Sequence, residues 1–217
     1  MTLTKTLAAT AAALAALPAA ALGAPVLSGV TADVFDVGDV PIGSVDQALD
    51  LVAGRSPDAA FAVTALDYPA GDDDTADSGT TSLSAFLGPD AASLTGTDLT
   101  LQDSVFVFTG QILLSEGEQT FAIGSDDGFR LTIGGSVIAE FNDSRGFGQT
   151  SVTVDAGVGL ASFMLVFYDD NGDGGIEFLV DGSIAEAVGA DVIPLPGAAV
   201  LLASGLVGAA AVRRRRT

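Results

Sequence analysis

Residues 124–131 have the sequence Gly-Ser-Asp-Asp-Gly-Phe-Arg-Leu, which is the strongest indication of the fold in this chain. Its centre, Ser125–Gly128, has the composition of a tight turn. The turn separates two β-rich runs, Thr120–Gly124 and Phe129–Ile133. In the second run apolar and polar residues alternate, which is typical of a half-exposed strand. The stretch therefore predicts a hairpin whose turn carries two adjacent carboxylates.

The same pattern of short β-rich runs and Gly/Asp turns extends in both directions along the chain. Within the run Val105–Leu114, Phe106 and Phe108 alternate with Val105 and Val107, which suits a strand covered on both faces. These features predict an all-β fold, an antiparallel sandwich or barrel. The expected strands are Val26–Phe35, Ala60–Leu66, Val105–Leu114, Thr120–Gly124, Phe129–Ile133, Val137–Phe141, Thr150–Val154, Leu160–Tyr168 and Ile176–Val180.

One short helix is predicted at Val45–Ala53. Ser44 can cap it with Gln47 as the capping-box partner, and Gly54 can end it. Ser82–Leu87 is expected to add a helical turn after a polar loop at residues 71–81.

A second acidic turn follows the strand Leu160–Tyr168 and has the sequence Asp-Asp-Asn-Gly-Asp-Gly-Gly at residues 169–175. Its spacing matches the first half of an EF-hand loop, but the twelfth position is Val180 rather than a bidentate Glu, so an EF-hand is rejected. Each turn alone is composed of ordinary turn residues. Together they offer only hard oxygen ligands, which calcium prefers. We expect the two turns to converge around one calcium ion.

The charge distribution favours the same interpretation. The chain has 28 acidic residues, all between Asp33 and Asp191. Only three basic residues lie in that region (Arg55, Arg130 and Arg145), which leaves it with a net charge of −25. Such a charge disfavours nucleic acid and anionic membrane surfaces as partners. Acidity can also serve only to keep an exported protein soluble.

The composition excludes several kinds of enzyme. The chain has no Cys and no His, so Ser-His-Asp triads, Cys nucleophiles and typical zinc sites cannot be built. Only a glycosidase would remain. Asp126 and Asp127 are adjacent, whereas glycosidase carboxylates face each other across a cleft. The sequence therefore predicts a non-catalytic protein. Arg130 is expected to be an outward-facing strand residue or an ion-pair partner of a nearby acid.

Both ends of the chain have the character of targeting segments. Residues 1–23 combine Lys5, an Ala/Leu run and small residues, as a cleaved signal peptide does. At the other end, residues 197–212 form an apolar stretch followed by Arg213–Arg216. As a helix, 16 residues would rise about 24 Å, slightly less than the ~30 Å hydrocarbon core. We expect a transmembrane helix with a cytoplasmic Arg-rich tail at 213–217.

The segment before this stretch, Ile193-Pro194-Leu195-Pro196, completes a pattern that resembles the VPLPA variant of the PEP-CTERM sorting tail. The resemblance implies recognition by an exosortase-type membrane enzyme, in bacteria that export exopolysaccharide. It also implies that the protein is held in the inner membrane before it reaches the cell surface or matrix. The expected organisation is a signal peptide (1–23), a β domain (25–185), a linker with the sorting motif (186–196), a membrane helix (197–212) and the tail.

The motifs of the middle region resemble the PA14 domain. They are Phe108-Thr109-Gly110, the stretch at residues 124–131, Ile133-Gly134-Gly135 and Asp173-Gly175-Glu177. The resemblance spans residues 27–182 and is specific within 104–181. It implies a β-sandwich or barrel that is often used for carbohydrate recognition in adhesins, toxins and glycosidases.

In lectin-like members of that family the paired aspartates bind calcium, in some cases across a cis peptide, and a loop with an Asn completes the ion's shell. The resemblance thus assigns calcium ligands to Asp126, Asp127, Asn171, Gly172 and Asp173. The chain has no Trp to stack on a sugar. Phe141, Phe147 and Tyr168 are the aromatic candidates. The alternative function is an acidic structural protein without a ligand site.

Overall fold

The computed structural model describes residues 27–71 and 73–189. The predicted signal peptide, sorting motif, membrane helix and Arg-rich tail lie outside these residues. Within the described part of the chain, no helix has the length and apolar character needed to cross a membrane.

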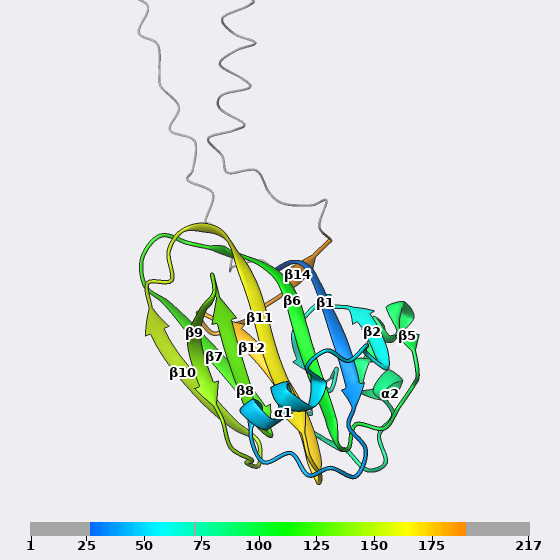
Figure 1. The fold of residues 1–217 in the computed structure, drawn as a ribbon. Helices are drawn as coiled ribbons and strands as arrows, with labels where there is room; N and C mark the ends of the chain where they lie inside the picture. Colours follow the sequence, from blue (N-terminus) through cyan, green and yellow to red (C-terminus); the bar gives the residue numbers. More distant parts are fainter. Residues whose placement is uncertain (1–26, 72, 190–217) are drawn as a thin grey trace, which may run out of the picture.

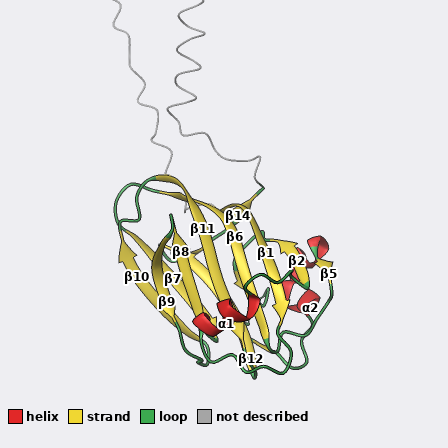
Figure 2. Cartoon of the chain, viewed as in Figure 1, coloured by secondary structure: helices red, strands yellow, loops and turns green. Residues whose placement is uncertain are grey.

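Two β-sheets face each other to form a sandwich (Figures 1 and 2). The larger, eight-stranded sheet has the order β5-β2-β1-β6-β11-β8-β9, with β14 beside β1. All of its strand pairs are antiparallel except β1 with β14. Its strands are β1 (Leu27–Asp36), β2 (Ala59–Ala62), β5 (Thr95–Gly96), β6 (Ser104–Leu114), β8 (Phe129–Ile133), β9 (Ser136–Phe141), β11 (Gly159–Asp169) and β14 (Ala187–Val188).

The smaller sheet has six strands and is antiparallel throughout. Its order is β10-β7-β12-β13, and β3 and β4 also pair with β12. The bounds are β3 (Asp67–Tyr68), β4 (Ala76–Asp77), β7 (Gln119–Asp126), β10 (Gly148–Val154), β12 (Asp173–Val180) and β13 (Ser183–Ile184). The fold class predicted from the sequence is therefore confirmed.

The nine expected strands are all present, and most differ from the prediction by one to three residues at an end. The strand expected at Ala60–Leu66 is too long, because β2 ends at Ala62. Beyond it, the Leu66 amide donates to the carbonyl of Ala185, so the chain has left the larger sheet. The polar loop expected at residues 71–81 is also corrected in part, since it contains β4.

Two α-helices and one 3-10 helix are present in the described residues: α1 (Val45–Val52), α2 (Leu83–Leu87) and η1 (Gly88–Ser93). The hydroxyl of Ser44 accepts from the Gln47 amide at 3.1 Å, which confirms the predicted cap of α1. The side chain of Gln47 accepts from Gly43 rather than from Ser44, so the capping box is not reciprocal. Ser82 caps α2 in the same manner as Ser44 caps α1.

The strand β6 has buried side chains on both faces, as its continuous apolar run predicts. Phe106 and Phe108 point between the two sheets, into the main core. Val105 points outward, where α1 covers a second, smaller core with Val45 and Ala48 (Figure 1). The larger sheet is therefore packed on its inner face by the smaller sheet and on part of its outer face by α1.

Arg130 forms ion pairs with α1 and with β9 on the outer face of the larger sheet. Its Nη2 lies 2.6 Å from Asp46 on α1, and its Nε lies 2.5 Å from Glu140 on β9. This confirms the predicted ion-pair role. Because Asp46 is largely exposed, we expect Arg130→Gln to lower the free energy of unfolding by only about 1 kcal/mol. Urea denaturation measures this change. A loss of several kcal/mol would mean that α1 depends on the ion pairs rather than on its apolar face.

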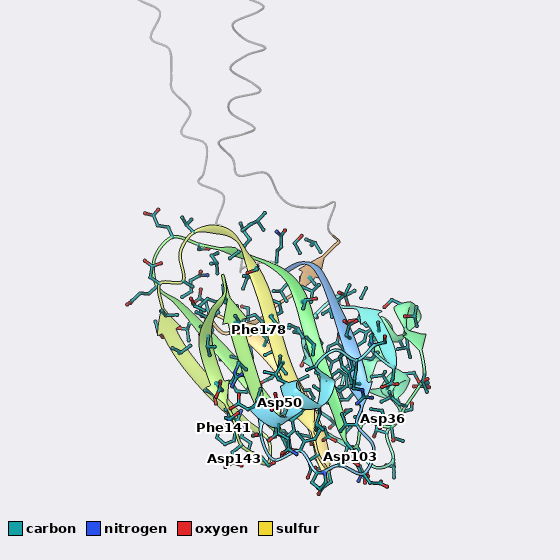
Figure 3. The ribbon with its side chains drawn as sticks, in the orientation of Figure 1. Asp36, Asp50, Asp103, Phe141, Asp143 and Phe178 are labelled. Carbon is teal, nitrogen blue, oxygen red and sulfur yellow. The ribbon has the colours of Figure 1, made fainter. Side chains whose placement is uncertain are left out.

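The two ends of the sandwich differ in character. Leu27 lies beside Ala187, so the first and last described strands meet at one end. The last residue of β1, Asp36, pairs with Ser104, which pairs with Asp169 at the other end. Ten residues of strand span about 33 Å. Asp36, Asp103, Phe141 and Asp143 all lie at this far end (Figure 3), which we call the acidic end.

Candidate functional site

The two acidic turns meet at the acidic end. In the pairing of β7 with β12, Asp126 lies opposite Gly175 and Ser125 lies opposite Ile176. The amide of Asp170 donates to Oδ2 of Asp127 at 3.0 Å. The amide of Asp127 in turn donates to the carbonyl of Tyr168 at 3.2 Å. The spatial convergence predicted from the sequence is therefore observed.

Close packing explains the glycine that ends the first turn. A Cβ atom at Gly128 would lie 2.6 Å from the Tyr168 ring and 2.8 Å from the carbonyl oxygen of Phe141. No other residue fits there without displacing backbone atoms. The peptide bond between Asp126 and Asp127 is cis, in agreement with the resemblance to the lectin-like PA14 domains.

Asp127 is 5% exposed, and backbone amides hold its carboxylate in place. Oδ1 accepts from the Arg145 amide at 3.0 Å, and Oδ2 accepts from Asp170. Burial raises the pKa of Asp127, and these two amides lower it. Each oxygen keeps a further lone pair, so the carboxylate can still coordinate a cation.

Asp126 is 8% exposed and less well supported. Burial raises its pKa to about 6, and the neighbouring charge of Asp127 adds to the increase. The Phe147 amide and the charge of Arg145 act in the opposite direction. Two adjacent, buried carboxylates repel each other, and a bound cation would remove that repulsion.

The second turn supplies oxygens of different availability. The side-chain amide nitrogen (Nδ2) of Asn171 donates to Oδ2 of Asp170 at 2.5 Å, which leaves the side-chain amide oxygen of Asn171 available. Asp173 is exposed at the start of β12. The carbonyl oxygen of Gly172, by contrast, accepts from both the amide and the hydroxyl of Ser78, at 2.8 and 3.0 Å. Both lone pairs of that carbonyl are therefore used.

Asp169, the last residue of β11, is a functional candidate that its motif does not distinguish from the other acids of the second turn. This side chain is 1% exposed, and neither carboxylate oxygen has a hydrogen-bond partner among the described residues. The Ser78 hydroxyl is near enough to lower its pKa, but it donates to Gly172 instead. Gly174 makes room for this carboxylate, since a Cβ there would lie 2.7 Å from Oδ1. Burial, together with the charges of Asp127 and Asp126, raises the pKa of Asp169 to about 8.

Arg145 is the second residue that the motifs did not identify. Its Nη2 donates to the Ser125 hydroxyl at 2.8 Å, and its Nε donates to the Ser125 carbonyl at 3.2 Å. The guanidinium carbon lies 4.2 Å from the centre of the Phe141 ring. Because Arg145 lies far from the acidic motifs in sequence and has no motif of its own, only the fold reveals its position.

The aromatic candidates for stacking on a sugar are not equivalent. Tyr168 is fully buried beneath α1, so the proposal that it stacks on a ligand is wrong. Phe141 is half-buried and lies against the Arg145 guanidinium. Phe147 is half-buried beside Gly124, and its amide approaches Asp126. Phe147 is therefore the aromatic ring best placed next to the paired aspartates.

Carboxylates alone do not complete a metal centre here. In residues 27–71 and 73–189, no three acidic side chains gather closely enough to hold a metal ion by themselves. A calcium ion takes six to eight oxygens, including backbone carbonyls, amides, waters and ligand hydroxyls. Any calcium at this site would therefore combine the Asp126–Asp127 pair with neutral oxygens.

Comparison with known proteins identifies the fold. No protein-family model and no curated protein sequence matches the chain. A solved structure of the PA14 domain of MpAFP antifreeze protein is similar, with 20% identity and a TM-score of 0.63 over 73% of this chain and 86% of that domain. A PA14 sugar-binding domain from an RTX adhesin gives 24% identity and a TM-score of 0.62 over 74% and 94%.

A more distant similarity links the chain to an anti-sigma factor domain-containing protein, with 14% identity and a TM-score of 0.51 over 77% of this chain and 50% of that one. None of these three structures is described as an enzyme. The two PA14 domains are each covered almost completely. The described part of this chain is therefore a β-sandwich with the PA14-like fold.

Proposed function

We propose that this protein is an exported, non-catalytic surface or matrix protein whose PA14-like domain binds calcium and, through the ion, carbohydrate. The observation that carries the proposal is the meeting of two acidic turns at one end of the sandwich, with Asp126 and Asp127 side by side and Asp170 bonded to Asp127. The proposed direct ligands are Asp126, Asp127 and the side-chain amide oxygen of Asn171. Asp173, which the resemblance also assigned, does not gather with the pair as a third carboxylate ligand, and its negative charge acts on Asp126 from nearby.

Two features of these residues fit calcium. The donor set consists only of carboxylate, amide and backbone oxygens, which hard cations prefer. In addition, the buried carboxyl of Asp169 has no hydrogen-bond donor, and its pKa is raised to about 8. A cation bound nearby would lower that pKa and stabilise the charged form. Gly172, which the resemblance also assigned, contributes least, because its carbonyl already accepts two hydrogen bonds.

Carbohydrate as the final ligand rests on the fold comparison, since one similar PA14 domain is described as sugar-binding. A calcium ion held by few protein ligands keeps open positions that sugar hydroxyls can occupy. Phe147 lies beside the site and supplies an apolar surface. The surrounding acids favour an uncharged polysaccharide over an anionic one.

Presentation at the surface agrees with the geometry. The described chain begins and ends at the end opposite to the acidic turns (Figure 1). A domain attached through either end would therefore direct the site away from its attachment. We further propose that an exosortase-type enzyme processes the tail at Ile193–Pro196, and that the segment 197–212 holds the protein in the inner membrane until then.

A thermal melt with calcium tests the binding proposal. A ligand that binds only the folded state at a hundredfold excess over its Kd stabilises it by about 2.7 kcal/mol, or roughly 5–10 °C in Tm. We expect this rise for the full chain in detergent when calcium chloride replaces a chelator. Asp127→Asn should abolish the rise, whereas Asp33→Asn, an exposed acid on β1, should retain it.

An unchanged Tm in millimolar calcium would contradict the proposal. The protein would then be an acidic structural component without a ligand site at these turns. If calcium binds, glycan-array screening with and without chelator tests the second step. Glycan binding that survives chelation would separate carbohydrate recognition from the ion.

A further inference from the structure

Arg145 contacts the paired-aspartate turn at several points. Its backbone amide holds Oδ1 of Asp127 at 3.0 Å. Its side chain holds both the carbonyl and the hydroxyl of Ser125, at 3.2 and 2.8 Å. The Ser125 hydroxyl donates to the carbonyl of Asp127 at 2.6 Å. One residue thus fixes the backbone before and after Asp126 and one oxygen of Asp127.

The guanidinium itself is held on its other sides. Its Nη1 donates to the Thr150 hydroxyl on β10 at 3.0 Å. Its central carbon lies 4.2 Å from the ring centre of Phe141 and 5.7 Å from that of Phe129. Cation–π contact with two rings and three side-chain hydrogen bonds leave the group little freedom to move.

The guanidinium of Arg145 places its positive charge near the aspartates without forming a hydrogen bond to their carboxylates. The charges of Arg145 and Asp126 interact, since each shifts the pKa of the other. Yet among the described residues the salt bridges involve only Arg55 and Arg130, and the three side-chain hydrogen bonds of Arg145 all go to neutral oxygens. The carboxylate oxygens therefore stay available to a cation.

We infer that Arg145 is the positioning residue of the cation site: it holds the Ser125–Asp127 turn in its binding geometry whether or not a cation is present. This inference rests on the proposed function and adds a residue that the motifs do not assign. It also sets two effects of opposite sign against each other. Loss of the positive charge should favour cation binding, whereas loss of the fixed geometry should weaken it.

Geometry should dominate, because partners that orient metal ligands typically change metal affinity by about 10- to 100-fold. Lysine keeps the charge of Arg145 but lacks the planar fork that reaches Ser125 and Thr150 together. We therefore expect Arg145→Lys and Arg145→Gln both to weaken calcium binding at least ~10-fold. Arg130→Lys, a matched change of an arginine that pairs with acids outside the site, should leave it unchanged.

The measurement is calcium affinity by isothermal titration of the full chain in detergent, with far-UV circular dichroism in chelator as the folding control. Thr150→Val is the milder variant, since it removes only the outermost hydrogen bond of the network. We expect it to fold normally and to weaken calcium binding by about threefold, a fraction of the effect of losing an orienting partner.

Several outcomes overturn the inference. If folded Arg145→Gln binds calcium as tightly as the wild-type protein, or more tightly, the geometry that Arg145 fixes does not determine the affinity. If Arg145→Lys retains full affinity, the planar fork of the guanidinium is not needed. If Arg145 variants fail to fold, unchanged affinity in Thr150→Val would overturn it. Absence of calcium binding by the unchanged protein would instead defeat the proposed function, and this inference with it.

Discussion

Asp169→Asn is expected to stabilise the calcium-free protein by about 3 kcal/mol at pH 8, which corresponds to a rise of roughly 6–12 °C in Tm. Most substitutions of buried residues destabilise a fold. Here the native side chain is a carboxylate that is 1% exposed and has no hydrogen-bond donor. Asn carries no charge, so the substitution removes the cost of burying a carboxylate. The gain is only partial, because the buried amide of Asn has a smaller desolvation cost of its own.

The effect should depend on pH with a definite sign. The pKa of Asp169 rises from 3.8 to about 8 on folding, so the folded state keeps a proton that the unfolded state loses. The contribution of Asp169 to the free energy of unfolding is therefore most favourable below about pH 4 and becomes less favourable as the pH rises to about 8. The difference is ~4 kcal/mol at pH 7. Asp126, with a pKa raised to about 6, adds a smaller change in the same direction.

Urea denaturation in chelator at pH 5 and pH 8 measures this prediction. Asp90 provides the matched control, because it is also a buried aspartate, at 5% exposure, but accepts from three donors. These are the amide and hydroxyl of Thr64 and the hydroxyl of Tyr68. Asp90→Asn should destabilise the protein by about 2 kcal/mol. If both substitutions changed the free energy of unfolding in the same direction, the lack of hydrogen-bond donors would not explain the effect at Asp169.

The positions of the strands could be predicted because their pattern is local. The alternation of apolar and polar residues in Phe129–Ile133 reflects a strand with one covered face, and the continuous apolar run Val105–Phe108 reflects a strand with both faces covered. The short strands β3, β4, β5, β13 and β14 could not be predicted, because each is only two residues long and is defined by its partner. Two residues carry no periodicity, so only the assembled sheets identify them.

The candidate site could be predicted in part for the same reason. Asp126, Asp127 and the loop at residues 169–175 stand out because acidic Gly-rich turns are visible in a sequence. Asp169 also belongs to that loop, but its burial and its lack of a donor depend on close packing against Gly174 at the start of β12 and on the Ser78 hydroxyl, which donates to Gly172 instead. Arg145 lies in an unremarkable loop and reaches Ser125 only through the folding of β7 beside β10. The ligand candidates can be recognised from local sequence motifs, whereas the residues that position them are revealed only by contacts between distant segments.

Phe108→Ala is expected to lower the free energy of unfolding by about 3–5 kcal/mol. Phe108 is fully buried at the centre of the larger sheet, between Ala32 on β1 and Leu165 on β11. Its ring stacks on those of Tyr68 and Phe106, at 6.3 and 6.1 Å between centres. Truncation would remove these contacts and leave a cavity that two paired sheets cannot readily close.

Val107→Ala, on the same strand, distinguishes the contribution of the outer core to stability from that of the inner core. Val107 faces outward, is only half-buried and packs against the small core beneath α1, so we expect a loss of about 1 kcal/mol. Urea denaturation of both variants at the same pH, with equal m-values, measures the difference. Because the inner core joins the two sheets whereas the outer core holds only one short helix, the two losses should differ several-fold. Similar losses would mean that α1 and the smaller sheet contribute equally to holding the larger sheet, and that the sandwich does not depend mainly on its aromatic interior.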